Sequence, residues 1–259
     1  MMQLSMRDYL VGCYKNKAQL VRHMSERWGE DNLYCPACDS GSLISTANNT
    51  PAVDFHCPGC TSRFQLKSGA TWSESRVPDA GYDAMMRALR SDAVPNLMVM
   101  QYAPDWSVRK LLLVPSFFFS PSCIEKRKPL SPSARRAGWV GCNILLSSIA
   151  DIGKLEMVQD GLVSDPSRVR DRYRILSPLA GREVEARGWT LDVLNMIRHR
   201  EWQSFSLEDA YTLEPALSGL YPANRNVRPK IRQQLQVLRD MGLIRFLGGG
   251  RYVFVDALP

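Results

Sequence analysis

Two pairs of cysteines, each separated by two residues, constrain the folding of this 259-residue chain more than any other feature. The first pair is Cys35 and Cys38, and the second pair, Cys57 and Cys60, follows after eighteen intervening residues. Tetrahedral zinc takes four ligands, with zinc–sulfur bonds of about 2.3 Å, and a Cys-x-x-Cys turn supplies two thiolates. We therefore predict a structural zinc site. A redox pair or plain free thiols are the alternatives.

The second cysteine pair lies between two segments of strand-like composition, so we predict that it forms the turn of a hairpin over Ala52–Ser68. Side chains alternate along a strand, which places Gln65 and Lys67 on one face. If Asp54 points to that face, three polar groups converge. Asp54 could offer a carboxylate oxygen to Mg²⁺ and Gln65 a neutral amide oxygen. Lys67 could orient an attacking water or stabilise charge on a phosphate. A merely polar sheet face would give the same pattern.

Charge favours a polyanionic partner. The formal net charge is +7 and the pI is about 9.1. Two runs concentrate the excess: 225–259 holds seven Lys/Arg against two Asp, and Lys126–Arg136 holds five Lys/Arg and no acid. Such clusters commonly contact phosphates, although two solvated faces would look the same.

Composition also limits where the chain acts. No apolar run reaches the roughly 18 residues needed to cross a bilayer, and the first thirteen residues lack a signal-peptide core. We therefore expect a cytoplasmic protein without a membrane partner, monomeric in solution. In that compartment Cys13, Cys123 and Cys142 are expected to be ordinary buried thiols.

The N-terminal part alternates between helical and strand-like segments, which predicts an α/β fold. The expected helices are 7–28 and 79–90, and the expected paired strands are 96–102 and 106–114. A polar stretch, 164–188, lacks apolar periodicity and is expected to contain a linker. We therefore place a domain boundary between residues 183 and 184.

The C-terminal part, 184–259, has the order of a winged-helix domain. Thr190 is expected to cap a first helix, Ser206 and Asp209 form a capping box for a second, and Asn226 is expected to cap a third that ends at Met241. Two strands, 243–246 and 251–255, then flank three consecutive glycines.

Several stretches of this sequence resemble the DpnI-like family of methyl-directed restriction endonucleases, within the PD-(D/E)xK nuclease superfamily. They are YCPAC at Tyr34–Cys38, the segment Asn48–Lys67, RKPLSPSARRAGWVGCNI at Arg127–Ile144, VQDG at Val158–Gly161, RGWTLDVLN at Arg187–Asn195 and IRQQLQVLRDMGLI at Ile231–Ile244.

The resemblance implies a PD-(D/E)xK nuclease core (1–183) with an embedded four-cysteine zinc site, followed by a small winged-helix DNA-binding domain (184–259). It implies cleavage of double-stranded DNA at GATC sites that carry N6-methyladenine, with Mg²⁺. Asp54 matches the metal-binding aspartate and Lys67 the catalytic lysine. Gln65 stands where the family has its catalytic acid, so a non-cleaving methyl-DNA reader or transcription regulator is the alternative. A zinc-ribbon scaffold would explain the cysteines but not the basic C-terminal helix.

Two surfaces are candidates for reading DNA. On the third C-terminal helix, apolar residues fall on one arc and polar residues on the opposite arc, where Gln can pair with adenine and Arg with guanine or phosphate. In the first domain an aromatic residue lies close to two arginines in sequence and could wedge a base step. The candidate DNA-binding residues are Arg135, Arg136, Trp139, Arg228, Arg232, Gln233, Gln236, Arg239 and Arg251. A solvated helix face, and a core position for Trp139, are the alternatives.

Overall fold

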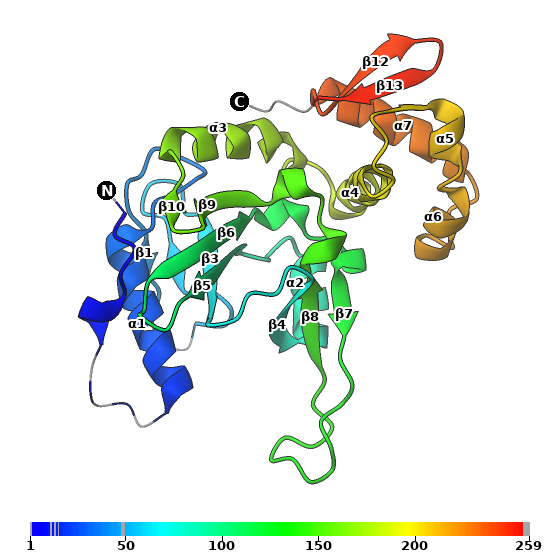
Figure 1. Cartoon of the computed structure of the whole chain (residues 1–259). Helices are drawn as coiled ribbons and strands as arrows, with labels where there is room; N and C mark the ends of the chain where they lie inside the picture. Colours follow the sequence, from blue (N-terminus) through cyan, green and yellow to red (C-terminus); the bar gives the residue numbers. More distant parts are fainter. Residues whose placement is uncertain (1, 11, 13, 15, 48–49, 256–259) are drawn as a thin grey trace. The chain divides into compact units, whose positions relative to one another are not determined.

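The computed structural model describes residues 2–10, 12, 14, 16–47 and 50–255, and the chain divides into two compact units. The first unit comprises residues 1–77, 93–116 and 152–174, and the second comprises 78–92, 117–151 and 175–259. Helices and sheets occur in both, as the α/β prediction requires (Figure 1). The predicted boundary between residues 183 and 184 stays a prediction.

A seven-stranded sheet forms the first unit, in the order β1-β2-β3-β5-β6-β9-β10. β3 pairs with β5 in parallel, and the other neighbours pair antiparallel. The strands are β1 (Ile44–Ser45), β2 (Phe55–His56), β3 (Arg63–Gly69), β5 (Asn96–Tyr102), β6 (Val108–Val114), β9 (Leu155–Gln159) and β10 (Leu162–Val163). Almost all of β5 and the second half of β6, Leu111–Val114, are buried, as expected for strands covered on both faces.

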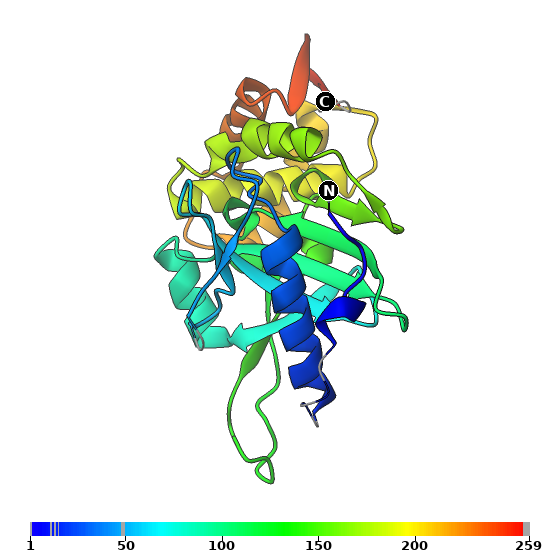
Figure 2. The ribbon, with the colours of Figure 1, turned by 90° about the vertical axis from the view of Figure 1, so that its left-hand side faces the viewer.

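Helix α1 (Lys17–Asn32) lies across one face of this sheet (Figure 2). It approaches so closely that a Cβ on Gly29 would lie 2.6 Å from the ring of Phe55, which explains a glycine at this position. The predicted helix over 7–28 is wrong at its start. The side chain of Asn16 accepts from Ala18 N–H at 2.9 Å and begins the helix there, while Arg7–Tyr9 form only a 3₁₀ turn.

Helix α3 (Pro166–Leu176, 11 residues) lies in the first half of the stretch in which a linker was expected. Its buried residues, Val169, Tyr173 and Leu176, recur at helical spacing. Only these few apolar positions stand among many arginines, so the local pattern was too sparse to reveal the helix. A 3₁₀ turn, Ser177–Leu179, follows it.

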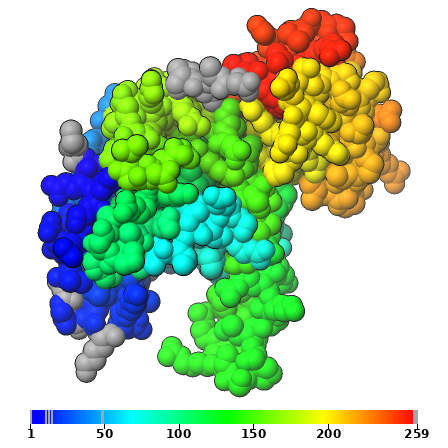
Figure 3. All heavy atoms as spheres, in the orientation of Figure 1, coloured from blue at the N-terminus to red at the C-terminus, as the bar shows by residue number. Residues whose placement is uncertain are grey.

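A three-stranded sheet in the order β4-β8-β7 and helix α2 precede the C-terminal part. Their bounds are β4 (Arg76–Gly81), α2 (Tyr82–Arg90), β7 (Ile124–Lys126) and β8 (Gly141–Leu145). Short 3₁₀ turns lie at Ser116–Phe118, Pro121–Cys123, Leu146–Ser148 and Asp151–Gly153. The loop 127–140 between β7 and β8 projects beyond the ends of its own strands (green in Figures 1 and 3).

The C-terminal part, as far as residue 255, contains four helices and a three-stranded sheet in the order β11-β13-β12. The elements are α4 (Val184–Arg198), β11 (Ser204–Ser206), α5 (Leu207–Tyr211), α6 (Glu214–Leu220), α7 (Val227–Asp240), β12 (Ile244–Gly248) and β13 (Arg251–Phe254). The capping box of Ser206 and Asp209 is confirmed, and α7 and the glycine turn fall where they were predicted. All three turn glycines have positive φ, which explains their use.

Three details of this part differ from expectation. Thr190 does not begin a helix: it is buried inside α4, and its hydroxyl donates to Gln234 Oε1 at 2.7 Å. The Asn226 side chain makes no capping hydrogen bond. Strand β11 and helix α6 were not predicted.

Within the described residues, no helix combines the length and apolar character needed to cross a membrane.

Candidate metal centre and active site

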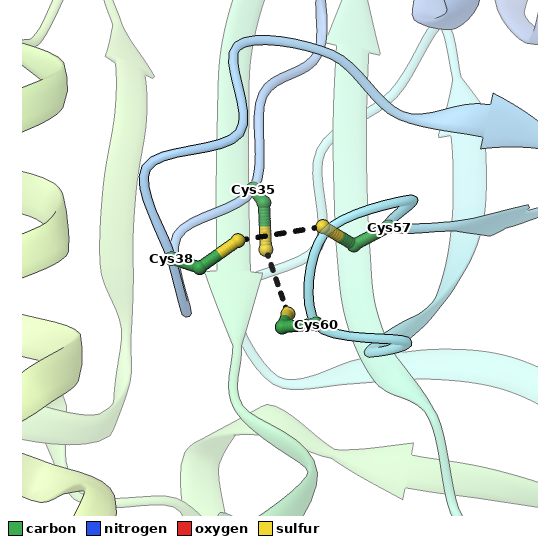
Figure 4. A group of neighbouring side chains, drawn as sticks. All are labelled: Cys35, Cys38, Cys57 and Cys60. Carbon is green, nitrogen blue, oxygen red and sulfur yellow. Dashed lines mark hydrogen bonds between the residues drawn. The ribbon is translucent and has the colours of Figure 1, made fainter.

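The four paired cysteines meet in one cluster, as the sequence predicted. Their sulfur atoms all lie within 4.8 Å of one another, with Cys35 and Cys60 at 3.6 Å and Cys38 and Cys57 at 3.5 Å. Figure 4 shows the two turns facing each other with the sulfurs pointing inward. Zinc–sulfur bonds of about 2.3 Å imply a sulfur–sulfur edge of about 3.8 Å in a tetrahedron. The cluster therefore fits a zinc ion that the four cysteines could hold.

The second turn is already shaped to favour a thiolate. Gly59 N–H donates to Cys57 Sγ at 3.3 Å, and Thr61 adopts a positive φ of 63° that closes the turn. Burial opposes ionisation of Cys57, but the backbone N–H groups of Cys60 and Gly59 outweigh it and lower the pKa of this thiol to about 6. Desolvation instead raises the pKa of the Cys35 thiol. Zinc would have to displace a proton from Cys35.

The remaining described cysteines lie elsewhere. Cys123 and Cys142 are buried, as expected, and their thiols donate to the carbonyls of Ser120 and Ala80. Burial raises the pKa of Cys123 to about 12, which makes it an inert thiol. The expectation for Cys13 lies outside the described residues.

The predicted hairpin is present, with the second cysteine turn at its tip, but its regular pairing is short. Phe55 pairs with Phe64, and the N–H of the preceding Asp54 also donates to Phe64 O, at 2.8 Å. The regular alternation of side chains between the two faces of the sheet therefore does not extend to Asp54. Its carboxylate Oδ2 instead accepts from Leu66 N–H at 2.7 Å. This bond brings the carboxylate against the β3 backbone between Gln65 and Lys67.

Gln65 and Lys67 both lie on β3, where the parallel register pairs them with Leu97 and Val99. Alternation along this strand places their side chains on one face. Gln65 is 7% exposed, and Lys67 is half-buried. Asp54, Gln65 and Lys67 thus occupy nearby positions on one hairpin.

Asp54 also lines a cavity of about 560 Å³ next to α1. The sequence analysis did not predict this cavity. Arg22 and Glu26 line the same cavity and form an ion pair with Nε–Oε1 of 2.6 Å. This ion pair raises the pKa of Arg22, and the charge of Asp54 adds to the effect. Gln65 and Lys67 are not among the residues that line the cavity. The i,i+4 spacing of Arg22 and Glu26 could have been noticed, but nothing local connects it with Asp54.

The predicted polar face of α7 is exposed. Val227, Ile231, Leu235 and Leu238 are buried, and the exposed residues are Arg228, Arg232, Gln233, Gln236 and Arg239. The three arginines of this face differ in whether an acidic side chain pairs with them. Arg228 pairs with Glu214 at 2.7 Å and Arg239 with Asp240 at 2.8 Å. Arg232 has no ion-pair partner in the part of the chain that the structure describes.

Arg251 is exposed directly after the glycine turn, at the start of β13. Its positive charge contributes to the lowered pKa of Asp209, after the hydrogen bonds from Ser206. The wing, which consists of β12, the glycine turn and β13, thus carries an exposed cation in the place that the sequence predicted.

In the loop 127–140, Arg135 and Arg136 are exposed, and the Arg136 guanidinium lies 4.7 Å from the ring centroid of Trp139. Trp139 is half-buried over Gly141, where an added Cβ would approach the indole to 2.8 Å. It is therefore not a core residue, and the arginines and the indole occupy the same exposed loop.

Comparison with family models gives two matches that together span most of the chain. A model described as DpnI, the Dam-replacing family, matches residues 2–180. A second, described as the Dam-replacing HTH domain, matches residues 185–253, which include nearly all of α4, the whole of α5 to α7 and nearly all of β13.

Proposed function

Because the chain belongs to the DpnI family, we propose that it is a methylation-dependent type II restriction endonuclease, acting with Mg²⁺ on double-stranded DNA at GATC sites that carry N6-methyladenine. The family supports restriction of DNA, and its C-terminal HTH domain supports DNA as the partner. The target sequence and the metal are part of the proposal. The observation that carries it is the Asp54 carboxylate, which is hydrogen-bonded to the strand that bears Gln65 and Lys67.

In the proposed site, Asp54 and Gln65 would hold Mg²⁺, and Lys67 would act on the phosphate. Oδ2 of Asp54 accepts from Leu66 N–H at 2.7 Å, which holds the carboxylate against β3. A bound Mg²⁺ would polarise the phosphate and stabilise negative charge. Lys67 would orient the attacking water or stabilise the charge that develops on the phosphate. We further propose that the mixed sheet with α1 is a PD-(D/E)xK core, and that zinc in the cysteine cluster fixes the hairpin tip.

For DNA recognition we propose that α7 enters the major groove. Gln233 and Gln236 would read adenine, while Arg228, Arg232 and Arg239 would contact guanine or phosphate. Arg251 of the wing would contact the backbone, and Arg135, Arg136 and Trp139 form a second reading surface.

Incubation of Dam-methylated and unmethylated plasmid with Mg²⁺ tests this function. We expect double-strand breaks only in the methylated plasmid, and a loss of cleavage of about 10²-fold or more in Lys67→Ala because transition-state charge is no longer stabilised. Lys110→Ala, on β6, is the matched control and should cleave normally. Equal cleavage of both plasmids would refute methyl dependence, and full activity of Lys67→Ala would refute the assigned site.

A non-cleaving methyl-DNA reader is the second candidate, and the neutral Gln65 is the specific observation that favours it. This reader would bind methylated duplex in a mobility-shift assay and leave it intact at every Mg²⁺ concentration. Binding without cleavage by the wild-type protein would select this alternative.

A further inference from the structure

Arg170 connects α3 to the first cysteine turn across more than 130 positions of the sequence. Its Nε donates to the carbonyl oxygens of Cys35, at 3.1 Å, and Cys38, at 2.9 Å. Its Nη2 donates to the carbonyl oxygen of Ser40 at 3.1 Å. Three carbonyl groups of one short loop therefore converge on one guanidinium.

The same side chain also packs on the residue before the turn. The Arg170 guanidinium lies 5.0 Å from the ring centroid of Tyr34, which is 6% exposed. Cys35 N–H donates to the Ser40 carbonyl at 3.1 Å, so the loop closes on itself around the arginine. A planar guanidinium has several donors in a fixed arrangement, whereas a lysine ammonium is a point charge on a flexible stem.

Charge provides a second reason for a cation here. Four thiolates (−4) and one Zn²⁺ (+2) leave a formal charge of −2, and Cys35 and Cys57 are fully buried. A buried net charge is costly unless an opposite charge lies nearby. The guanidinium of Arg170 binds carbonyl groups of the loop that carries two of the four cysteines. Its positive charge therefore lies next to this loop, and all four sulfur atoms remain available to the metal.

A neighbouring residue of α3 supports the other side of the cluster. Tyr173 OH donates to Asn96 Oδ1 at 3.2 Å, and Asn96 Nδ2 donates to Arg63 O at 3.0 Å, at the start of the strand that follows the second cysteine turn. Thus α3 contacts the first turn directly and reaches the strand after the second turn through Asn96.

We propose that Arg170 is a positioning residue that holds the first cysteine turn in its zinc-binding geometry and thereby couples zinc loading to the order of α3. The coupling is reciprocal. The factor by which Arg170 strengthens zinc binding equals the factor by which zinc stabilises the docked α3. The inference rests on the zinc site within the proposed function and is independent of nuclease activity.

Zinc release from the full-length protein to a chromogenic chelator tests the first half of the coupling. We expect release to be about 10–100-fold faster in Arg170→Gln, the range typical for loss of a group that supports metal ligands. Arg170→Lys, which retains the charge but not the planar donor set, should fall between this variant and the wild type. Arg168→Gln, at an exposed position on the same helix, is the control and should release zinc at the wild-type rate. When cobalt replaces zinc, we expect the d–d absorption band of Arg170→Gln to be shifted relative to that of the wild-type protein.

Two further measurements separate positioning from general stabilisation. Zinc should raise the Tm and slow amide exchange over 166–176 in the wild type, and both responses should shrink in Arg170→Gln, so that the substitution lowers the Tm more with zinc than without it. Equal losses of Tm in the metal-free and zinc-loaded variant would overturn the proposal, as would an unchanged release rate. A wild-type protein that binds no zinc would also overturn it, whereas DNA that stays uncut would refute only the nuclease assignment.

Discussion

Gln65 stands at the position where the family resemblance expects an acid, and its side chain is almost completely buried. A neutral amide contributes one oxygen ligand but no charge, so the proposed site has only the carboxylate of Asp54 to attract Mg²⁺. We therefore expect weaker Mg²⁺ binding with Gln65 than with an acid at this position.

Gln65→Glu should therefore lower the Mg²⁺ concentration at half-maximal cleavage by about tenfold, or about 1.4 kcal/mol. The reason is the added negative charge. Titration of plasmid cleavage against Mg²⁺ measures the shift, and Gln101→Glu, on the neighbouring β5, serves as the control. An unchanged midpoint would show that residue 65 does not contribute to metal binding.

Asp192 illustrates how a buried carboxylate can act on stability alone. It is 4% exposed on α4 and accepts from Ser122 and from Tyr221, whose OH lies at 2.7 Å. Burial raises its pKa although these hydrogen bonds oppose the shift. Its contribution to the free energy of unfolding is therefore fully present below the unfolded value of about 3.9, and it is lost as the pH rises through the higher folded pKa.

Asp192→Asn should consequently gain stability relative to the wild type as the pH rises from about 4 to 7.5. Asp209→Asn should show the opposite trend, because hydrogen bonds from Ser206 lower the pKa of Asp209. Urea unfolding at several pH values, followed by tryptophan fluorescence, measures both differences. A constant stability difference for Asp192→Asn would show that its pKa is not raised.

At the scale of elements, α7 shows which part of a recognition surface a helical pattern can predict. Periodicity identified the exposed arc, but two of its arginines are paired with acids on α6 and α7. An arginine that must first break an ion pair with a carboxylate contributes less to phosphate binding than an arginine without such a pair.

Arg232→Ala should therefore weaken DNA binding at low salt more than Arg228→Ala does, and should reduce the slope of log K against log salt by about 1. Gln236→Ala should instead leave the slope unchanged and reduce discrimination at the adenine by about 1–3 kcal/mol. Fluorescence anisotropy over a series of salt concentrations distinguishes these effects. Identical slopes for Arg232→Ala and the wild type would exclude a phosphate contact at this residue.

For the whole molecule, two separate candidate reading surfaces give a way to obtain high methyl specificity. Burial of one methyl group contributes only about 1–3 kcal/mol, or roughly 10–200-fold. If α7 and the loop 127–140 each test the methylated site, their discrimination factors multiply.

Trp139→Ala should then reduce the preference of cleavage for methylated over unmethylated GATC duplex by about tenfold or more, and should do so again when combined with Gln236→Ala. Cleavage rates on matched duplexes give the ratios, and circular dichroism confirms folding. A Trp139→Ala variant with wild-type preference would assign all discrimination to the C-terminal part.

The sequence alone determined the features that depend on short spacing. The cysteine pairs, the hairpin turn at the second pair, the capping box at Ser206 and the glycine turn of the wing each follow from a few neighbouring residues, whose geometry is local. The apolar stripe of α7 likewise predicted its buried and exposed faces.

The tertiary structure decided what brings distant residues together. The contact of Asp54 with Leu66 depends on where the ladder ends, the cavity with Arg22 and Glu26 depends on how α1 packs, and the three bonds of Arg170 span 130 to 135 positions. These contacts arise from the packing of whole elements on one another, which no local periodicity encodes.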